Sequence, residues 1–417
     1  MSTPLGHLRV VEMATAIQGP AAGMYLSDMG AEVIKVEPPW GEMNRYFRGA
    51  NNTLPPEVLG SQFVAMNRGK RSVCLDIHTE LGLRAVQRLV AGADVFLSNY
   101  REKALVKMGL GYDEVKSLNP GIIYGHVNGF GPRGPDADKT MLDGAAIARG
   151  GLASVTGSVE TGPIAPGATI ADTAGAMQLA LAIMTALVTR TRDGCGQKVQ
   201  TSALGAQLWL QQWELTHVWM TGTMLKLSGA HHGAINGPYG IYETADSEHF
   251  LFALAQSDES WDQFWLFVDD PQQAINPKWD TPGKRLGNFA SQQDAAEIQQ
   301  RMREAFKTKT TKQWQTFLAT QSGIVYEKVQ NYDEVRTDPQ LLANEYLQQL
   351  HLQHVGETTI VGNLISFSET PASVEGILPA LGVDTETVLR DLGFSSDETE
   401  SVIQHATAER EDLLGNS

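Results

Sequence analysis

Residues 8–37 read LRVVEMATAIQGPAAGMYLSDMGAEVIKVE, and this stretch decides the fold. Residues 8–13 and 32–36 are short apolar runs of the kind that form buried strands. Between them a Gly/Pro loop opens a helix over residues 21–29. Gly30 ends that helix, because glycine readily adopts the left-handed conformation that follows a helix. A strand, a helix and a second strand in this order predict a parallel βαβ unit.

The same alternation continues along the chain. Three further apolar runs, at residues 72–75, 94–97 and 122–127, predict strands, and residues 80–90 predict a helix between two of them. Strands separated by helices favour an α/β fold with a large doubly wound, Rossmann-like parallel sheet. Ligands of such sheets bind at the carboxyl ends of the strands.

A smaller α+β domain is expected to follow. A long helix over about 202–220 carries three tryptophans that we expect to pack in a core. A Gly-rich loop at 229–240 then precedes a predicted hairpin and further helices. The remaining elements are expected at residues 241–244 and 250–253 (hairpin), and at 260–268, 294–306, 385–392 and 397–408 (helices). We therefore divide the chain into residues 1–222, 223–331 and 332–417.

The composition is that of an ordinary globular protein, with 42% hydrophobic and 19% charged residues among 417. A net charge of −16 without a basic stripe argues against nucleic acid as a partner. The only two cysteines, Cys74 and Cys195, predict no disulfide framework and favour a reducing cytoplasm. The start of the chain shows no signal peptide. Its longest apolar stretch, residues 174–188, is too short for a bilayer and predicts a buried helix rather than a membrane span.

Asp172 is one carboxylate among small and apolar residues, directly before the apolar helical run at residues 176–188. It could be a helix N-cap, whose oxygen accepts a hydrogen bond from a first-turn N–H group. It could also be a nucleophile, because its small neighbours let a ligand approach and a helix N-terminus favours an anion. The two roles are compatible, and the local sequence leaves both open.

Several other kinds of site are excluded or left weak. The loop after the first strand reads Gly19-Pro20-Ala21-Ala22-Gly23 and lacks the G-x-G-x-x-G fingerprint, so NAD(P) is not expected. Neither a zinc ligand spacing nor a G-x-S-x-G nucleophile motif is present. Cations do gather near predicted strand ends, at Arg45, residues 67–71, residues 99–103 and Lys107. Singly they fit solvated loops, but together they favour a site for a polyphosphate ligand.

Taken as a set, four stretches resemble the family III CoA-transferases, which include formyl-CoA transferase and carnitine CoA-transferase. They are residues 19–37, 67–76, 94–111 and 128–131. The tail is similar as well, with Leu-Pro-Ala-Leu-Gly at 378–382 and Val-Leu-Arg-Asp-Leu-Gly at 388–393. The resemblance extends from Leu5 to about Ile403.

The resemblance implies that Asp172 is the nucleophile and that coenzyme A binds in the N-terminal half. The implied CoA-binding residues are Ile17, Gln18, Leu75, Asp76, Ile77, His78, Asn99, Tyr100, Arg101, Lys107, Thr140, Met141, Leu142 and Asp143. It also implies an interlocked homodimer in which the segment from residue 332 returns to the large domain. No permanently bound cofactor or metal is implied, and the substrates are an acyl-CoA and a small carboxylic acid.

This chain departs from the family pattern at several positions. Pro38 stands where formyl-CoA transferase has an arginine that contacts CoA, and Lys107 replaces a second arginine. A lysine offers a point charge where arginine offers a bidentate fork. Leu142-Asp143 replaces a Tyr-Glu pair. The reaction type is expected to be retained, while the identity of the acids does not transfer.

The expected reaction passes through an aspartyl–acyl anhydride and an aspartyl-CoA thioester. Burial should raise the pKa of Asp172, and a rise of about two units would still leave roughly 90% of it ionised at pH 7. Backbone N–H groups of residues 229–240 are candidate oxyanion donors. One alternative is an α-methylacyl-CoA racemase, which needs a second base; Leu142 stands where racemases have histidine, and His126 fits a structural residue better. The other alternative is a CoA-binding protein without catalysis.

Overall fold

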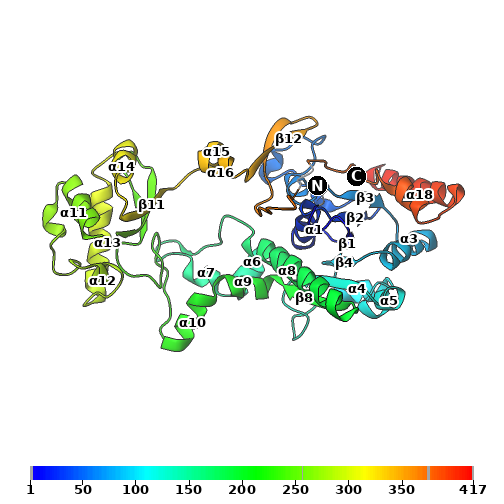
Figure 1. Cartoon of the computed structure of the whole chain (residues 1–417), viewed down its shortest axis with the longest axis horizontal. Helices are drawn as coiled ribbons and strands as arrows, with labels where there is room; N and C mark the ends of the chain where they lie inside the picture. The colour runs from blue at the N-terminus through cyan, green and yellow to red at the C-terminus, as the bar shows by residue number, and fades with distance from the viewer. Residues whose placement is uncertain (1–2, 256, 373–375, 416–417) are drawn as a thin grey trace. The chain divides into compact units, whose positions relative to one another are not determined.

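The computed structural model describes residues 3–255, 257–372 and 376–415, and the chain divides into two compact units (Figure 1). The first unit combines Met1–Gly150, Ala168–Leu210 and Arg336–Ser417. The second combines Gly151–Gly167 and Gln211–Val335. The chain therefore leaves the first unit twice and returns to it for its C-terminal segment.

The first unit is built on a six-stranded sheet with the order β3-β2-β1-β4-β5-β8, in which all neighbours are parallel. The strands are β1 (Arg9–Met13), β2 (Glu32–Glu37), β3 (Arg71–Cys74), β4 (Val95–Ser98), β5 (Ile123–Asn128) and β8 (Gln197–Ser202). This order reverses direction beside β1, as in doubly wound folds. The five strands predicted from apolar runs are confirmed. The sixth, β8, was missed because its sequence QKVQTS is polar and it lies at the edge of the sheet.

Helices cover both faces of this sheet. They are α1 (Gln18–Asp28), α2 (Ser61–Met66), α3 (Glu80–Ala91), α4 (Glu102–Lys107), α5 (Tyr112–Leu118), α6 (Asp143–Arg149), α8 (Ile170–Asp193) and α9 (Ala203–Leu210). Short 3₁₀ turns lie at Met43–Arg45 (η1) and Ala50–Asn52 (η2). Helix α1 begins at Gln18, three residues earlier than predicted.

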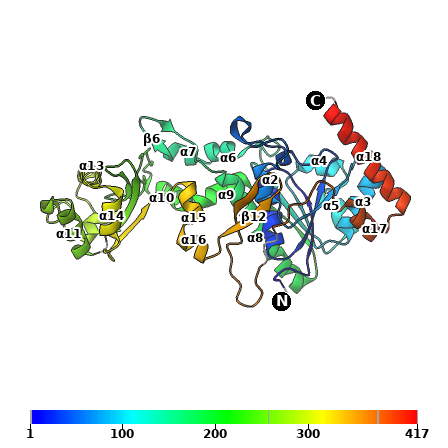
Figure 2. The same cartoon turned by 90° about the horizontal axis from the view of Figure 1, so that it is seen from above.

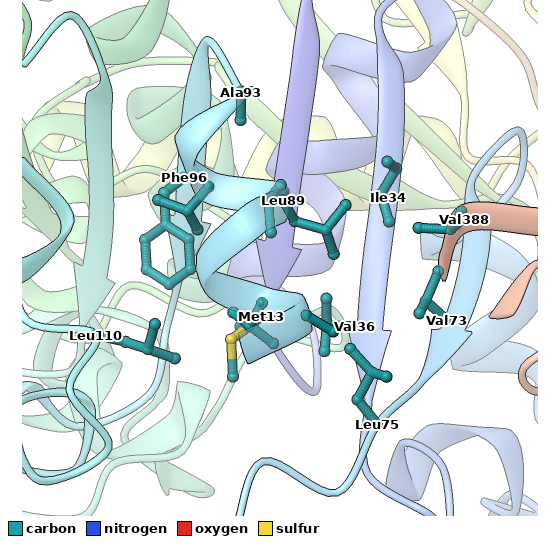
Figure 3. Packing of buried hydrophobic residues seen from close by; sticks show 14 of the residues in the cluster. Met13, Ile34, Val36, Val73, Leu75, Leu89, Ala93, Phe96, Leu110 and Val388 are labelled. Atoms are coloured by element: carbon teal, nitrogen blue, oxygen red, sulfur yellow. The ribbon is translucent and has the colours of Figure 1, made fainter. Parts of the chain in front are cut away.

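Alternate residues of each strand feed two separate cores. On one face Val10 joins a cluster with side chains of α1 and α8. On the other face Val11 joins a cluster with α3, α5 and the C-terminal helices. Figure 3 shows this second cluster, where Leu89 of α3 lies over Val36 of the sheet and Val388 lies beside Val73. Burial on both faces explains why the central strands are continuous apolar runs.

The C-terminal segment covers the exposed edge of β3. It comprises α16 (Pro339–Ala343), the hairpin β12 (Leu347–Leu352) and β13 (Gly356–Val361), α17 (Thr385–Asp391) and α18 (Ser396–Gly415). Asp384 accepts the N–H of Ser72 at 2.9 Å, and Thr385 accepts that of Cys74 at 2.9 Å. These bonds occupy donors that an edge strand otherwise offers to another chain. Helix α18 lies beside α3 in both views (Figures 1 and 2).

Helix α8 is longer than predicted and contains Asp172. Its N-cap residue is Thr169, and Gly194 ends it in the left-handed conformation. Asp172 is the third residue of the helix, so of the two roles left open for it the N-cap role does not hold. By length and composition α8 could cross a membrane, with 44% of the apolar window buried inside the structure. Its contacts with β5, β8 and α1 are those of a core helix.

The second unit contains the predicted hairpin in a three-stranded antiparallel sheet of order β11-β10-β9. Its elements are α7 (Leu152–Val155), β6 (Gly157–Ser158), β7 (Gly162–Pro163), α10 (Gln212–Thr221), β9 (Gly240–Glu243), β10 (His249–Ala255), α11 (Asp258–Phe267), η3 (Pro271–Gln273), α12 (Pro282–Arg285), α13 (Gln292–Phe306), α14 (Thr311–Leu318) and β11 (Ile324–Lys328), with α15 (Tyr332–Thr337) where the chain leaves the unit. Its core is aromatic, with Phe306 stacked on Trp314 at 4.3 Å between ring centroids. The single helix predicted over 202–220 is broken at Gln211 into α9 and α10.

Candidate active site

Asp172 lines a cleft of about 260 Å³ in the first unit, at the carboxyl ends of β1, β4 and β5. The other walls are the loop after β1 (residues 15–18), the loop after β4 (residues 99–102) and the segment from the end of β5 to Leu142. We call this the Asp172 cleft. Its place at the strand ends is where ligands bind in open α/β sheets.

A second cleft, of about 290 Å³, adjoins the first and shares Thr15 and Tyr100 with it. Its walls are the loop after β2 (residues 36–43) and the loop after β3 (residues 75–78). We call it the β2–β3 cleft. The two clefts are therefore neighbours at the carboxyl end of the sheet.

The structure brings most of the expected site residues to these two clefts. The Asp172 cleft is lined by Ile17, Gln18, Asn99, Tyr100, Arg101, Thr140, Met141 and Leu142. The β2–β3 cleft is lined by Leu75, Asp76, Ile77, His78 and Tyr100. Asp143 contacts the backbone of α8. Lys107 is exposed at the end of α4 and lines neither cleft.

The carboxylate of Asp172 is nearly enclosed. It is 9% exposed, and its Oδ1 atom is buried without a hydrogen-bond partner. Burial raises its pKa to about 6, the nearby charge of Asp143 adds to the rise, and the Gln18 amide acts in the opposite direction. The direction of this rise is the one expected from burial. A buried oxygen that no protein group satisfies is poised for a ligand, because unpaired buried polar atoms are costly.

Asp143 is the residue that caps α8. It is the first residue of α6, and its Oδ1 accepts the N–H groups of Ala171 at 2.8 Å and Asp172 at 3.0 Å. Thr169 occupies the N-cap position of α8, but its side chain accepts no hydrogen bond from the first turn of the helix. The cap thus comes from another helix, 29 positions before Asp172. It fixes the first turn of α8 and places a second negative charge beside the nucleophile candidate.

The side-chain amide of Asn99 is hydrogen-bonded to the protein backbone. Its Oδ1 accepts the N–H of Thr15 at 2.9 Å, and its Nδ2 donates to the carbonyl of Thr15 at 2.6 Å. The side chain therefore ties the loop after β1 to the loop after β4. This is a positioning contact, and it uses both ends of the amide.

Several of the cations proposed to gather around a polyphosphate form ion pairs within the fold, and Arg45, Arg68 and Lys70 are buried in them. Arg45 forms two hydrogen bonds with the carboxylate of Glu37, at 2.7 and 2.6 Å, and is 2% exposed. Arg68 pairs with Asp28, Lys70 with Glu12, and Arg71 with Glu32 and Asp384. The expectation that these residues form an anion site is wrong, because the opposite charges already lie on the neighbouring strands and helices.

Two exposed cations do line the Asp172 cleft, Arg101 and Lys139. Arg101 donates to the hydroxyl of Thr140, and Lys139 Nζ lies 5.7 Å from the centre of the Phe130 ring. Sequence reasoning missed Lys139. The signal was available, since a cation beside Thr140 in the segment after β5 lies next to residues already assigned to the site.

His126 on β5 reaches the cleft but both of its ring nitrogens are engaged. Nε2 lies 2.7 Å from the carbonyl oxygen of Tyr100, and Nδ1 lies 3.3 Å from Nε2 of Gln200. Only a neutral ring with the proton on Nε2 satisfies both neighbours, and burial lowers the pKa of His126. The ring is a structural link, as predicted, rather than a base.

The Gly-rich loop at 229–240 lies in the second unit, and its residues contact one another and other residues of that unit. Gly229 donates to the carbonyl of Gly157, and His231 Nδ1 lies 2.9 Å from the carbonyl oxygen of Tyr239. His232 stacks on Trp213 and lies 3.2 Å from Glu214. Across residues 3–255, 257–372 and 376–415, no cluster of three His, Cys, Asp or Glu side chains could hold a metal ion.

Nearly the whole chain matches one protein family. A family model described as CoA-transferase family III matches residues 5–385. The chain belongs to this family. Family III CoA-transferases move CoA between acyl groups, so this chain is an enzyme whose substrates are CoA thioesters.

Two named CoA-transferases and one solved structure match nearly the whole chain. It is 31% identical over 404 residues to succinyl-CoA–D-citramalate CoA-transferase of Chloroflexus aurantiacus, covering 95% of this chain and 96% of that relative. It is 28% identical over 393 residues to human succinyl-CoA:glutarate CoA-transferase, covering 93% and 86%. The solved structure of a CAIB/BAIF family protein from Brucella suis has 29% identity and a TM-score of 0.81, and covers 94% of this chain and 100% of that one.

Proposed function

We propose that this family III CoA-transferase moves CoA from an acyl-CoA to a free carboxylic acid, with Asp172 as the covalent nucleophile. The observation that carries the proposal is the buried, unpartnered Oδ1 of Asp172 at the wall of the strand-end cleft. The surroundings suit such a role, because the first turn of α8 presents its positive end to the carboxylate.

The proposed chemistry has four balanced steps. The Asp172 carboxylate attacks the thioester carbonyl, an acyl–aspartyl anhydride forms, and CoA leaves as the thiolate. The thiolate attacks the Asp172 carbonyl, which gives an aspartyl-CoA thioester and releases the donor acid. The acceptor carboxylate attacks this thioester, forming a new anhydride and again freeing the thiolate. Attack of the thiolate on the new acyl carbonyl yields the product acyl-CoA and restores Asp172.

The raised pKa of Asp172 is compatible with this role. With a pKa of about 6, roughly 90% of the carboxylate is ionised at pH 7. Removal of water makes it a stronger nucleophile, and the neighbouring charge of Asp143 favours the protonated form but leaves most of the carboxylate ionised at this pH.

We further propose that CoA lies along the two adjoining clefts. Leu75, Ile77 and Tyr100 offer apolar surface in the β2–β3 cleft, and Arg101 and Lys139 offer charge for phosphate groups. The thioester end would then reach Asp172. We also propose that Lys107 contacts CoA. The domain boundaries at residues 222 and 331 and a cytoplasmic location are proposed as well.

For the acids, we propose small dicarboxylates as the first compounds to test. The relatives named above transfer CoA from succinyl-CoA to glutarate or D-citramalate. The purified protein would be incubated with succinyl-CoA and a panel of ¹³C-labelled acids in D₂O, and the thioesters followed by mass spectrometry. Label in a new thioester without deuterium at the α-carbon supports transfer. Rapid α-deuteration without exchange would show a racemase, for which Leu142 and the engaged His126 supply no second base.

We also propose a homodimer. The outward side of α8 exposes Met177, Leu181 and Val188, each by more than half of its surface. Trp209 on α9, expected to be packed in a core, is 64% exposed in the single chain. Such contiguous apolar surface on one element is typical of a protein interface. A second copy of the chain is the partner that the family resemblance implies.

A further inference from the structure

Ala16 has a left-handed backbone conformation, with φ of +63°, in the loop between β1 and α1. This conformation disfavours residues other than glycine, because the Cβ atom crowds the following carbonyl. Asn and Asp reach it with help from their own polar side chains. Among the non-glycine residues with positive φ in the described chain, Ala16 is the one without a polar side-chain atom. Its conformation must be held by other residues.

Three side chains from other loops hold this one. Glu42 Oε1 accepts the N–H of Ala16 at 2.8 Å, and Asn44 Nδ2 donates to the carbonyl of Ala16 at 2.9 Å. Asn99 makes the corresponding two bonds to Thr15. All four backbone polar atoms of two consecutive residues are thus bonded to side chains. A flexible loop could not keep four such bonds, so the loop is preset.

The carboxylate of Glu42 is itself held in place by a buried network of charged side chains. Lys35 Nζ lies 2.6 Å from Glu42 and 2.9 Å from Glu12, and Lys70 Nζ lies 2.8 Å from Glu12. All four side chains are at most 4% exposed, and two lysines balance two glutamates. Breaking such a pair leaves an uncompensated buried charge, so the carboxylate of Glu42 has one stable position.

The loop leads directly to the Asp172 cleft. Ile17 and Gln18 follow Ala16 and line the cleft, and Gln18 is 7% exposed with its Oε1 unpartnered. The Gln18 side chain lies against Gly175 of α8, where an added Cβ would be 2.8 Å from Oε1. A rotation at Ala16 would therefore move Gln18 relative to Asp172.

We propose that Glu42 and Asn44 are positioning residues for the transfer reaction, which hold Ala16 in its left-handed conformation and thereby set Gln18 beside Asp172. The inference rests on the proposed function. It assigns a role in catalysis to side chains through the hydrogen bonds that they make to the loop. Displacement of a positioned group by about 1 Å can cost two orders of magnitude in rate, so the effect should appear in kcat.

The test compares Asn44→Ala with Asn67→Ala. Asn67 is a matched control, since it is a fully buried asparagine that bonds Lys70 of the same network without touching Ala16. We expect Asn44→Ala to lower kcat about tenfold or more with KM for acyl-CoA changed by less than about threefold. Asn67→Ala should lower Tm to a similar extent and keep kcat within about threefold of wild type.

Ala16→Gly distinguishes positioning from general stability. Glycine takes the left-handed conformation without strain, so adding Ala16→Gly to Asn44→Ala should recover much of the lost kcat. Glu42→Gln, which keeps an acceptor for the Ala16 N–H, should be milder than Glu42→Leu. Equal kcat losses in Asn44→Ala and Asn67→Ala, or no recovery in the double variant, would overturn the inference.

Hydrogen–deuterium exchange of the peptide spanning residues 15–19 gives a readout that does not depend on turnover. We expect faster exchange in Asn44→Ala and wild-type exchange in Asn67→Ala. Unchanged exchange in Asn44→Ala would contradict the role of Asn44 even if the enzyme is active. Absence of CoA transfer by the wild-type protein would instead reject the proposed function, with the exchange data still deciding what holds the loop.

Discussion

The Oδ1 atom of Asp143 accepts the backbone N–H of Asp172 at 3.0 Å. One carboxylate therefore caps the helix that carries the other and also raises the pKa of its partner. The arrangement combines two opposed demands. The first turn of α8 needs an acceptor, while the nucleophile needs to be an anion at neutral pH.

Asp143→Asn separates these two effects. The amide oxygen can still accept the two N–H groups, but the charge that raises the pKa of Asp172 is removed. The acid limb of the pH profile of kcat/KM should therefore move to lower pH, with activity at pH 7 within about threefold of wild type. Asp136→Asn, in the loop before α6, should leave the limb in place. An unchanged limb in Asp143→Asn would show that burial alone sets the pKa.

Asp172→Asn should stabilise the folded protein in a pH-dependent way. The pKa of Asp172 rises on folding from its ordinary value of 3.8 to about 6, so folding favours the protonated form. The favourable contribution of Asp172 is present below pH 4 and is lost as pH rises through 6. Replacement by Asn should hence raise stability on the order of 2–3 kcal/mol at pH 7.5 and much less at pH 4. Thermal denaturation of Asp193→Asn, at the other end of α8, is the control. A gain that does not vary with pH would contradict the raised pKa.

Arg45 and Arg101 should behave differently although both are cations near the strand ends. Although burial opposes it, the Arg45 guanidinium holds the pKa of Glu37 below its usual range. Arg45→Gln should cost about 3–5 kcal/mol of unfolding free energy, because Glu37 is left unpaired. Arg101 is exposed, so Arg101→Gln should raise KM for acyl-CoA and leave Tm nearly unchanged. The opposite pattern, a lower Tm for Arg101→Gln and a higher KM for Arg45→Gln, would indicate that Arg45 binds phosphate.

The purified enzyme should be a dimer of about twice the 45.3 kDa chain mass in light scattering at micromolar concentration. Leu181→Lys places a charge in the middle of the exposed apolar side of α8 and should weaken the dimer or cause misassembly. Lys312→Ala, on α14, should not. A stable wild-type monomer would refute the proposed assembly.

The sequence predicts the sheet well for a physical reason. Strands buried on both faces have to be apolar throughout, and β1, β2, β4 and β5 are recognisable for that reason. Strand β8 is half-buried at the edge, so no apolar run marks it. The break at Gln211 was missed because the helical pattern continues across it.

The candidate site was less predictable, because partners distant in sequence decide what each polar side chain does. Asn99 and Arg45 are typical site residues by type and place, yet one is bonded to Thr15 and the other to Glu37. Charged residues within apolar strands, such as Lys35 in β2, were an available signal that ion pairs lie inside the fold. Nothing in the local sequence links Asp143 to the helix of Asp172.

Trapping of the covalent intermediate tests the central claim most directly. The enzyme would be mixed with acyl-CoA, treated with hydroxylamine, digested and analysed by mass spectrometry, with Asp172→Asn as the control. The account predicts a hydroxamate at Asp172 that requires acyl-CoA, and no CoA exchange by Asp172→Asn. An unmodified Asp172 during turnover, or wild-type exchange by Asp172→Asn, would contradict it.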